Sequence, residues 1–329
     1  MAQTALSAVL PAHESAASST SEQYGPVHIV APKADSNLTD DLTNLRINYA
    51  FSSLPYHPET LFMGMINTMR HLAYEDFTSL LQGTQTFAPP AAYLFSTLTY
   101  TDAGLLGEKA SRVKHLVAAL ELMAQDFTKE TAFSGVSFEL LLEEVVIGRG
   151  KIFFNSRASS DALGPTHNAT NEVHVNVSDD KTGEISPAAN VTGDQGLSPE
   201  RHMTYFKQRI PDAMPISEVS TLSVFVYALA QEARRPFAGR IEPTLFAAPG
   251  SETVVRVSAG ANHFPQVLLA YGLTGGLWYA ALEMYKRSIW EPMRVEMYRD
   301  GRRAGYLDVL NLHETRLLPA DDARPDAIF

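Results

Sequence analysis

Residues 65–73 read MINTMRHLA and residues 222–230 read LSVFVYALA. The apolar and small residues of the first stretch are Met65, Thr68, Met69, Leu72 and Ala73. Spacings of three and four residues place them on one face of an α-helix. The second stretch has apolar or small residues at the same places, namely Leu222, Phe225, Val226, Leu229 and Ala230. The match predicts an equivalent helix in each half of the chain.

The correspondence extends from residues 42–155 to residues 199–312 at a constant offset of 157. Pro58 and Pro215 both lie where the first helix of a copy is expected to begin, because a first helical turn leaves its N–H groups unpaired and proline has none. A second amphipathic helix, over about 108–127 in the first copy, recurs in the second. The pattern predicts an α+β fold of two similar lobes from an internal duplication, each roughly β-α-β-α-β-β with a terminal antiparallel hairpin.

The two terminal hairpins differ in their turn residues. Asp300 and Gly301 suit a type I′ turn, because both tolerate a positive φ. Glu143 and Glu144 occupy the equivalent place and suit that turn poorly, so a wider loop or a different register is expected there. Gly148 and Gly305 interrupt the last strand of each copy, which predicts a bulge or a close backbone approach.

The rest of the chain divides around these copies. We expect a flexible, acidic, Ala/Ser-rich tail over 1–41, an acidic linker over 156–198 and a flexible acidic tail over 313–329. The first tail contains a short strand-like run, Val27–Ala31, and the linker contains an alternating run, Glu172–Ser178, typical of a half-buried strand or arm. Residues 82–92 contain Gly83, Pro89 and Pro90 and are expected to form a loop.

Composition bounds the class of protein. The chain has 329 residues, 45% of them hydrophobic, and no cysteine, so it is globular and cannot form a disulfide scaffold or a thiolate site. The net charge is −11, which does not suit binding to nucleic acid. An arginine-rich hairpin is interpreted as a solvated strand edge protected by charge, with an anionic partner as the alternative. Its arginines are Arg294, Arg299, Arg302 and Arg303.

No targeting signal is apparent, and we expect a cytoplasmic location. Residues 267–282 are uncharged and mostly apolar. Sixteen residues are short for a bilayer about 30 Å thick, so a buried central helix is expected and a membrane contact is not.

Candidate site residues fall into three groups. Glu75 and Glu232 occupy equivalent positions at the offset of 157 and are candidates for a catalytic pair of carboxylates, although solvated glutamates are the plainer interpretation. His167, His174 and Asp179 are candidates for a metal site, but their spacing matches no tight motif and we expect no metal and no cofactor. His57, His71, His115 and His263 are scattered, and those on predicted helices are interpreted as structural.

No serine nucleophile motif, phosphate-binding loop or dinucleotide fingerprint occurs, so the sequence leaves open whether the protein is an enzyme. We expect a non-catalytic interaction or self-assembly protein, a homo-oligomer that associates through the apolar helix over 267–285 and that has room for a further protein partner. The interface residues would be Tyr271, Gly272, Gly276, Trp278 and Tyr279. One alternative is a cofactor-independent enzyme or small-molecule-binding protein with a pocket at the lobe junction. Another is a coat-like protein that forms a shell.

Overall fold

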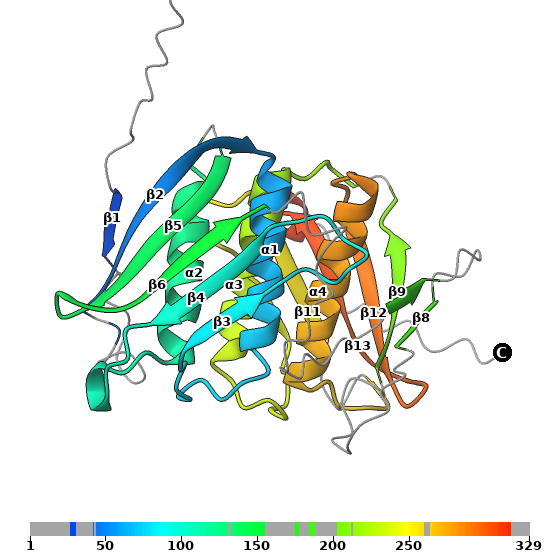
Figure 1. Cartoon of the computed structure of the whole chain (residues 1–329). Helices are drawn as coiled ribbons and strands as arrows, with labels where there is room; N and C mark the ends of the chain where they lie inside the picture. Colours follow the sequence, from blue (N-terminus) through cyan, green and yellow to red (C-terminus); the bar gives the residue numbers. More distant parts are fainter. Residues whose placement is uncertain are drawn as a thin grey trace, which may run out of the picture.

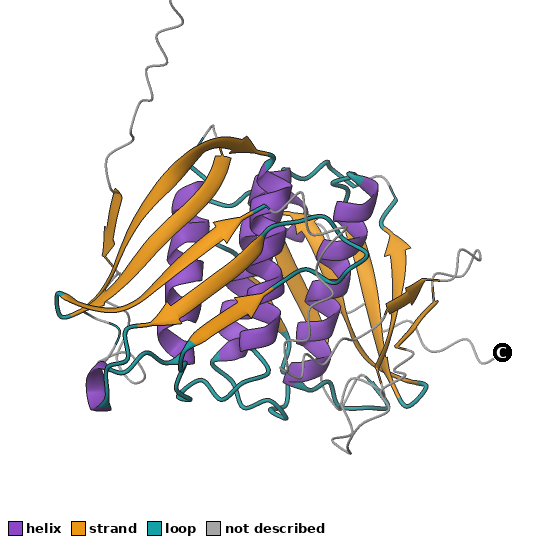
Figure 2. Cartoon of the chain, in the orientation of Figure 1, coloured by secondary structure: helices purple, strands orange, loops and turns teal. Residues whose placement is uncertain are grey.

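A computed structural model of the chain describes residues 27–30, 42, 44–130, 133–154, 175–177, 184–187, 203–211, 213–259 and 264–316. Two antiparallel sheets enclose a layer of four α-helices (Figures 1 and 2). The core lies on both sides of this helical layer, where the helices meet the inner faces of the sheets.

Each lobe contributes one sheet and two helices. Lobe 1 contains β1 (Val27–Val30), β2 (Leu45–Tyr56), α1 (Pro58–Leu72), β3 (Thr84–Phe87), β4 (Thr97–Asp102), the 3₁₀ turn η1 (Gly107–Lys109), α2 (Val113–Phe127), β5 (Phe133–Leu142) and β6 (Val145–Phe153). Lobe 2 contains β9 (Met203–Arg209), α3 (Glu218–Ala233), β10 (Thr244–Phe246), β11 (Thr253–Ala259), α4 (Ala270–Arg287), β12 (Met293–Arg299), β13 (Arg302–Asn311) and η3 (Leu312–Arg316). Two short strands that lie between the lobes in the sequence, β7 (Val175–Val177) and β8 (Glu184–Pro187), extend the second sheet at one edge.

The two lobes have the same strand order. The first sheet runs β1-β2-β5-β6-β4-β3, and the second runs β10-β11-β13-β12-β9-β8-β7. Counted from the strand before the first helix, β2-β5-β6-β4-β3 corresponds to β9-β12-β13-β11-β10. The α+β fold with two similar lobes and terminal hairpins is therefore confirmed. Its origin in a duplication of one ancestral unit stays a prediction.

The predicted offset of 157 is wrong in the first helix of each lobe. The residues that precede α1 and α3, His57 and Ser217, are 160 positions apart, whereas those that precede α2 and α4, Arg112 and Leu269, are 157 apart. Pro58 does begin α1, but Pro215 lies before the cap of α3. A shift of three residues is close to one helical turn, so the apolar periodicity could not reveal it.

Lobe 1 also departs from two predicted boundaries. The sequence predicts the first helix from Pro58 to about Leu81, but it ends at Leu72. The second helix begins at Val113, not near 108. The predicted loop over 82–92 contains a short strand, β3, which pairs antiparallel with β4 at the edge of the sheet.

Both predicted glycine positions are confirmed. The strand register shifts beside the pairs Leu140–Gly148 and Met297–Gly305, so each closing hairpin contains a bulge at the equivalent place. A Cβ on Gly148 would lie 1.9 Å from the hydroxyl of Tyr100, and one on Gly305 would lie 2.6 Å from a backbone oxygen. Only glycine fits these close contacts.

The linker and first tail supply edge strands. β7 falls inside the predicted run Glu172–Ser178 and, with β8, extends the chain's own second sheet. β1 falls inside Val27–Ala31 and pairs with β2.

The arginine-rich hairpin β12–β13 is not a sheet edge, because β12 lies between β13 and β9. The strand-edge interpretation is therefore wrong. Arg294 instead binds the buried carboxylate of Asp308, with Nε 2.6 Å from Oδ1, and Arg303 lies 2.9 Å from Glu296. These arginines balance carboxylates on the outer face of the sheet.

The turn at Glu143 and Glu144 has two residues, as in lobe 2, so the expected wider loop is wrong. Both glutamates adopt positive φ, 50° and 66°, and so do Asp300 and Gly301. Left-handed backbone costs a side-chain-bearing residue about 1 kcal/mol or more. The β5–β6 turn is therefore strained where the β12–β13 turn is not.

Replacing this turn with the double substitution Glu143→Asn and Glu144→Gly should raise the free energy of unfolding by about 1 kcal/mol. The ion pairs of these glutamates with Lys109 and Arg46 are solvent-exposed and offset little of the gain. Urea denaturation measures the change. The matched control is Gly301→Glu, which should destabilise by a similar amount because Gly301 has a φ of 74°. A Cβ there meets no atom within 4 Å, so the backbone conformation alone causes the loss. A destabilised double variant would contradict the strain argument.

Candidate functional site

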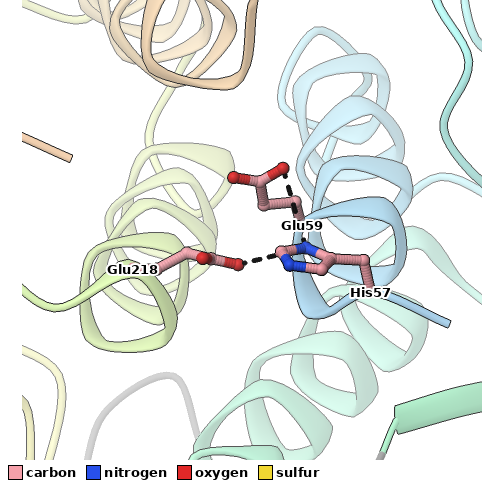
Figure 3. Close-up of side chains that lie close together, drawn as sticks. All are labelled: His57, Glu59 and Glu218. Carbon is pink, nitrogen blue, oxygen red and sulfur yellow. Dashed lines mark ion pairs between the residues drawn. The ribbon is translucent and has the colours of Figure 1, made fainter. Parts of the chain in front are cut away.

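The first helices of the two lobes, α1 and α3, pack on each other in the helical layer. Their N-terminal ends lie side by side (Figure 3). His57 is the N-cap of α1, Glu59 lies in its first turn, and Glu218 is the first residue of α3. The junction of the lobes therefore brings three metal-ligating side chains together from two helix ends.

Among the described residues, His57, Glu59 and Glu218 form the group whose ligand atoms all lie within 4.8 Å of one another. Nδ1 of His57 lies 3.7 Å from Oε2 of Glu59 and 3.5 Å from Oε1 of Glu218. Figure 3 shows the imidazole of His57 facing both carboxylates. The His57 side chain is 61% exposed, whereas those of Glu59 and Glu218 are 11% and 24% exposed. The group is therefore buried on the carboxylate side and reachable from solvent through the imidazole.

Trp290, which follows α4, fixes the orientation of one carboxylate. Its indole Nε1 donates a hydrogen bond of 2.9 Å to Oε1 of Glu59. That bond leaves Oε2 of Glu59 facing His57. The contact also ties the C-terminal end of α4 to the N-terminal end of α1.

Electrostatics at this site oppose the ionised form of Glu218. Burial raises the pKa of Glu218, and the charge of Glu59 raises it further. His57 and the backbone amide of Glu59 act in the opposite direction. Oε1 of Glu218 is buried and accepts no hydrogen bond. Helix N-termini favour negative charge. The charges of Glu59 and Glu218 nevertheless repel each other, because the two carboxylates lie close together.

The predicted catalytic pair, Glu75 and Glu232, does not form. The backbone N–H of Glu75 bonds to the carbonyl of Leu72, and in lobe 2 the equivalent bond joins Arg235 to Glu232. Glu232 is thus the counterpart of Leu72, not of Glu75, and Glu75 lies exposed in the turn after α1. The pairing failed because it rested on the offset of 157.

Glu232 is nevertheless unusual. It is 1% exposed, and neither carboxylate oxygen accepts a hydrogen bond. Burial raises the pKa of Glu232 to about 7, although the charge of Arg235 opposes the shift. The two side chains form an ion pair of 3.2 Å without hydrogen-bonding geometry.

A second contact between the lobes involves the neighbours of Glu232 in sequence. Glu121 on α2 binds Gln231 on α3 and Arg234, the C-cap of α3, through both carboxylate oxygens. Burial raises the pKa of Glu121, and the charge of Arg234 and the Gln231 hydrogen bond lower it. This is a satisfied ion pair that joins the lobes, and it offers no free ligand atom.

The predicted metal ligands His167, His174 and Asp179 lie outside the described residues, as does His263. His71 is partly buried at the end of α1, and burial, followed by the charge of Arg70, lowers its pKa to about 4. His115 is buried in the first turn of α2, where its Nδ1 accepts a hydrogen bond from the Arg112 amide. Both helical histidines therefore have structural surroundings, as the sequence predicted.

The predicted interface residues lie inside the chain. Gly272 and Gly276 let α4 approach its own sheet, because a Cβ on either would lie under 3 Å from Met203 or Met297. Trp278 is 5% exposed and packs against Phe95 of lobe 1. Tyr271 and Tyr279 are also buried. These residues therefore pack α4 within one molecule, and their proposed contact with a second copy loses its physical basis.

Sequence reasoning noted His57 but missed Glu59 and Glu218. Both follow helix-capping positions, His57-Pro58 and Ser217, which mark two helix starts. Acidic residues are ordinary at such places, so the sequence carried no sign that the two starts meet. No helix among the described residues is both long and apolar enough to cross a membrane.

No protein-family model matches the chain, and no curated protein matches it. A solved structure assigned provisionally as a thioesterase, from Novosphingobium aromaticivorans DSM 12444, is 14% identical with a TM-score of 0.12; the match covers 83% of this chain and 96% of that one. A second solved structure is a conserved protein of unknown function with a hot dog fold, from Alicyclobacillus acidocaldarius. It is 11% identical with a TM-score of 0.12, and the match covers 84% of this chain and 97% of that one. Similarities this low carry no argument about fold or activity.

Replacing Glu232 with leucine, the residue at the equivalent position of lobe 1, should stabilise the protein above neutral pH. A carboxyl whose folded pKa is about 7 against an ordinary 4.5 favours folding at low pH and opposes it once ionised. The advantage of Glu232→Leu over the wild type should therefore grow by roughly 3 kcal/mol as the pH rises from 4.5 to 7.5. Urea denaturation across this range measures it, with Glu75→Leu as the exposed control. If the stability difference between Glu232→Leu and the wild type did not change with pH, the pKa of Glu232 would not be raised in the folded protein.

Proposed function

We propose that the protein binds a divalent transition-metal ion at the lobe junction, through His57, Glu59 and Glu218. The supporting observation is the convergence of one imidazole nitrogen and two carboxylate oxygens, from both lobes, within 4.8 Å. With such a site, the protein would be a small-molecule-binding protein or an enzyme whose binding site lies between the lobes.

The distances suit a shared ion. Zinc binds histidine nitrogen and carboxylate oxygen at about 2.0–2.2 Å, so two ligand atoms of a tetrahedral ion lie about 3.4 Å apart. His57 Nδ1 is 3.5 and 3.7 Å from its two carboxylate neighbours. Small side-chain adjustments would therefore place all three atoms around one ion.

The charges suit a cation as well. Burial and the charge of Glu59 both raise the pKa of Glu218. A central dication would attract both carboxylates and so remove their mutual repulsion. Trp290 holds the other oxygen of Glu59, as outer hydrogen bonds orient the carboxylates of metal sites.

One imidazole and two carboxylates favour Zn²⁺ or Mn²⁺. Three protein ligands leave a tetrahedral ion one position for water or for a substrate oxygen. Such an ion polarises a bound carbonyl or phosphoryl group, or activates its water as a nucleophile. The exposed side of His57 gives a ligand access to that position.

Non-catalytic self-assembly is a less favoured proposal. It rested on an apolar helix in need of a cover, and α1 and α3 cover α4 inside the chain. The coat-like alternative draws support from none of these contacts.

Isothermal titration of the full chain with ZnCl₂, and separately with MnCl₂, tests the proposal. One ion should bind per chain, and His57→Ala or Glu218→Gln should weaken binding about 100-fold or more, because each removes a direct ligand. Binding should also weaken as the pH falls, since protons compete for the ligands. Glu75→Gln, an exposed glutamate outside the site, is the matched control.

The metal-free stability of Glu218→Gln separates this proposal from a purely structural ion cluster. Because the pKa of Glu218 is raised, removal of its charge should stabilise the metal-free protein at pH 8. In a structural cluster held by His57, the same change would destabilise it. Absence of saturable binding by either ion in the wild type would rule out the metal site.

A further inference from the structure

A buried arginine on α1, Arg70, lacks a carboxylate partner. The residue is 6% exposed, and its Nε is buried without a hydrogen-bond acceptor. Within the described part of the chain, no acidic side chain forms an ion pair with it. Its guanidinium carbon lies 4.9 Å from the centre of the Trp278 ring, so the side chain reaches from lobe 1 onto α4 of lobe 2.

Two features of the surroundings favour the positive charge, but neither supplies an acceptor for Nε. Arg70 lies in the last turn of α1, where the helix terminus favours a cation, and the Trp278 face adds a cation–π contact. Each of these effects is weaker than a charge-assisted hydrogen bond to a carboxylate. Buried charges in proteins are normally paired, so this position suits an anionic ligand.

The local charge indicates a monoanion. His71, the adjacent titratable residue, is neutral at pH 7, because burial and the charge of Arg70 lower its pKa to about 4. A single guanidinium therefore supplies the positive charge at this position. A carboxylate balances a single positive charge, whereas a phosphate dianion would leave a buried negative charge in excess.

Two further features describe the ligand. Asn67, one turn earlier on the same helix face, is fully buried and its Oδ1 has no hydrogen-bond partner, while its Nδ2 donates to the Ala88 carbonyl. That oxygen suits a hydroxyl group. Phe95, edge-on to Trp278 at 6.0 Å, makes the neighbourhood aromatic and suits an apolar body.

We infer that Arg70, between α1 and α4, binds the carboxylate of a small monocarboxylic acid with an apolar body, and that Asn67 accepts a hydrogen bond from a hydroxyl on it. This site is separate from the proposed metal site and does not depend on it. At 1.5 Å per residue, Arg70 lies about 16 Å along α1 from Glu59.

Thermal unfolding of the full chain tests the inference, with sodium butyrate, sodium 2-hydroxybutyrate and sodium phosphate as probes against NaCl of equal ionic strength. Butyrate should raise the wild-type Tm with increasing concentration, and 2-hydroxybutyrate should raise it further. Phosphate should do no more than NaCl. Arg70→Met should weaken both carboxylates about 10- to 100-fold, the value of a charge-assisted hydrogen bond. Arg149→Met, an exposed arginine of lobe 1, should bind like the wild type.

Tryptophan fluorescence gives a second readout that needs no arginine variant. The chain has two tryptophans, and Trp290→Phe leaves Trp278 as the reporter beside Arg70. Butyrate should change its emission saturably. Equal Tm shifts in the wild type and Arg70→Met, or no fluorescence change in Trp290→Phe, would overturn the inference. Equal affinity for the two carboxylates would overturn the role of Asn67.

Discussion

The packing of the helices of one lobe against those of the other is the constraint on which the structure depends. Each sheet buries one face on its own two helices, and those helices then present their remaining sides to the helices of the other lobe. α4 is buried over nearly its whole length because a sheet lies on one side and α1 and α3 lie on the other. Neither lobe could hide its helices alone, so the lobes have a single shared interior.

This arrangement explains how much of the fold the sequence could predict. Strand and helix types followed from local periodicity, and Gly148 and Gly305 marked the bulges, because these features depend on neighbouring residues. The offset near α3 escaped detection because three residues are almost one helical turn. The cover of α4 escaped as well, since an all-apolar helix requires a partner without indicating whether the partner belongs to the same chain.

The candidate site was beyond sequence reasoning for a related reason. Glu59 and Glu218 are separated by more than 150 residues, and each is an ordinary acidic residue at a helix start. Their meeting is a consequence of α1 lying beside α3. Conversely, Glu75 and Glu232 are separated by the predicted offset of 157 but do not occupy equivalent positions in the two lobes. A site built from residues of both lobes can be identified only when it is known which residues of the two lobes occupy equivalent positions.

The junction also retains charges that its packing does not require. At positions where Glu232 and Arg70 are buried, the equivalent residues of the other lobe are Leu72 and Ala230, both apolar and buried. The same fold therefore accommodates an uncharged residue at each place, and the charged residue costs stability in one lobe only. Structural necessity does not account for such an asymmetry. For Arg70, the proposed carboxylate ligand would account for the asymmetry, because it would pair with a charge that costs stability on its own, whereas no described contact gives Glu232 such a role.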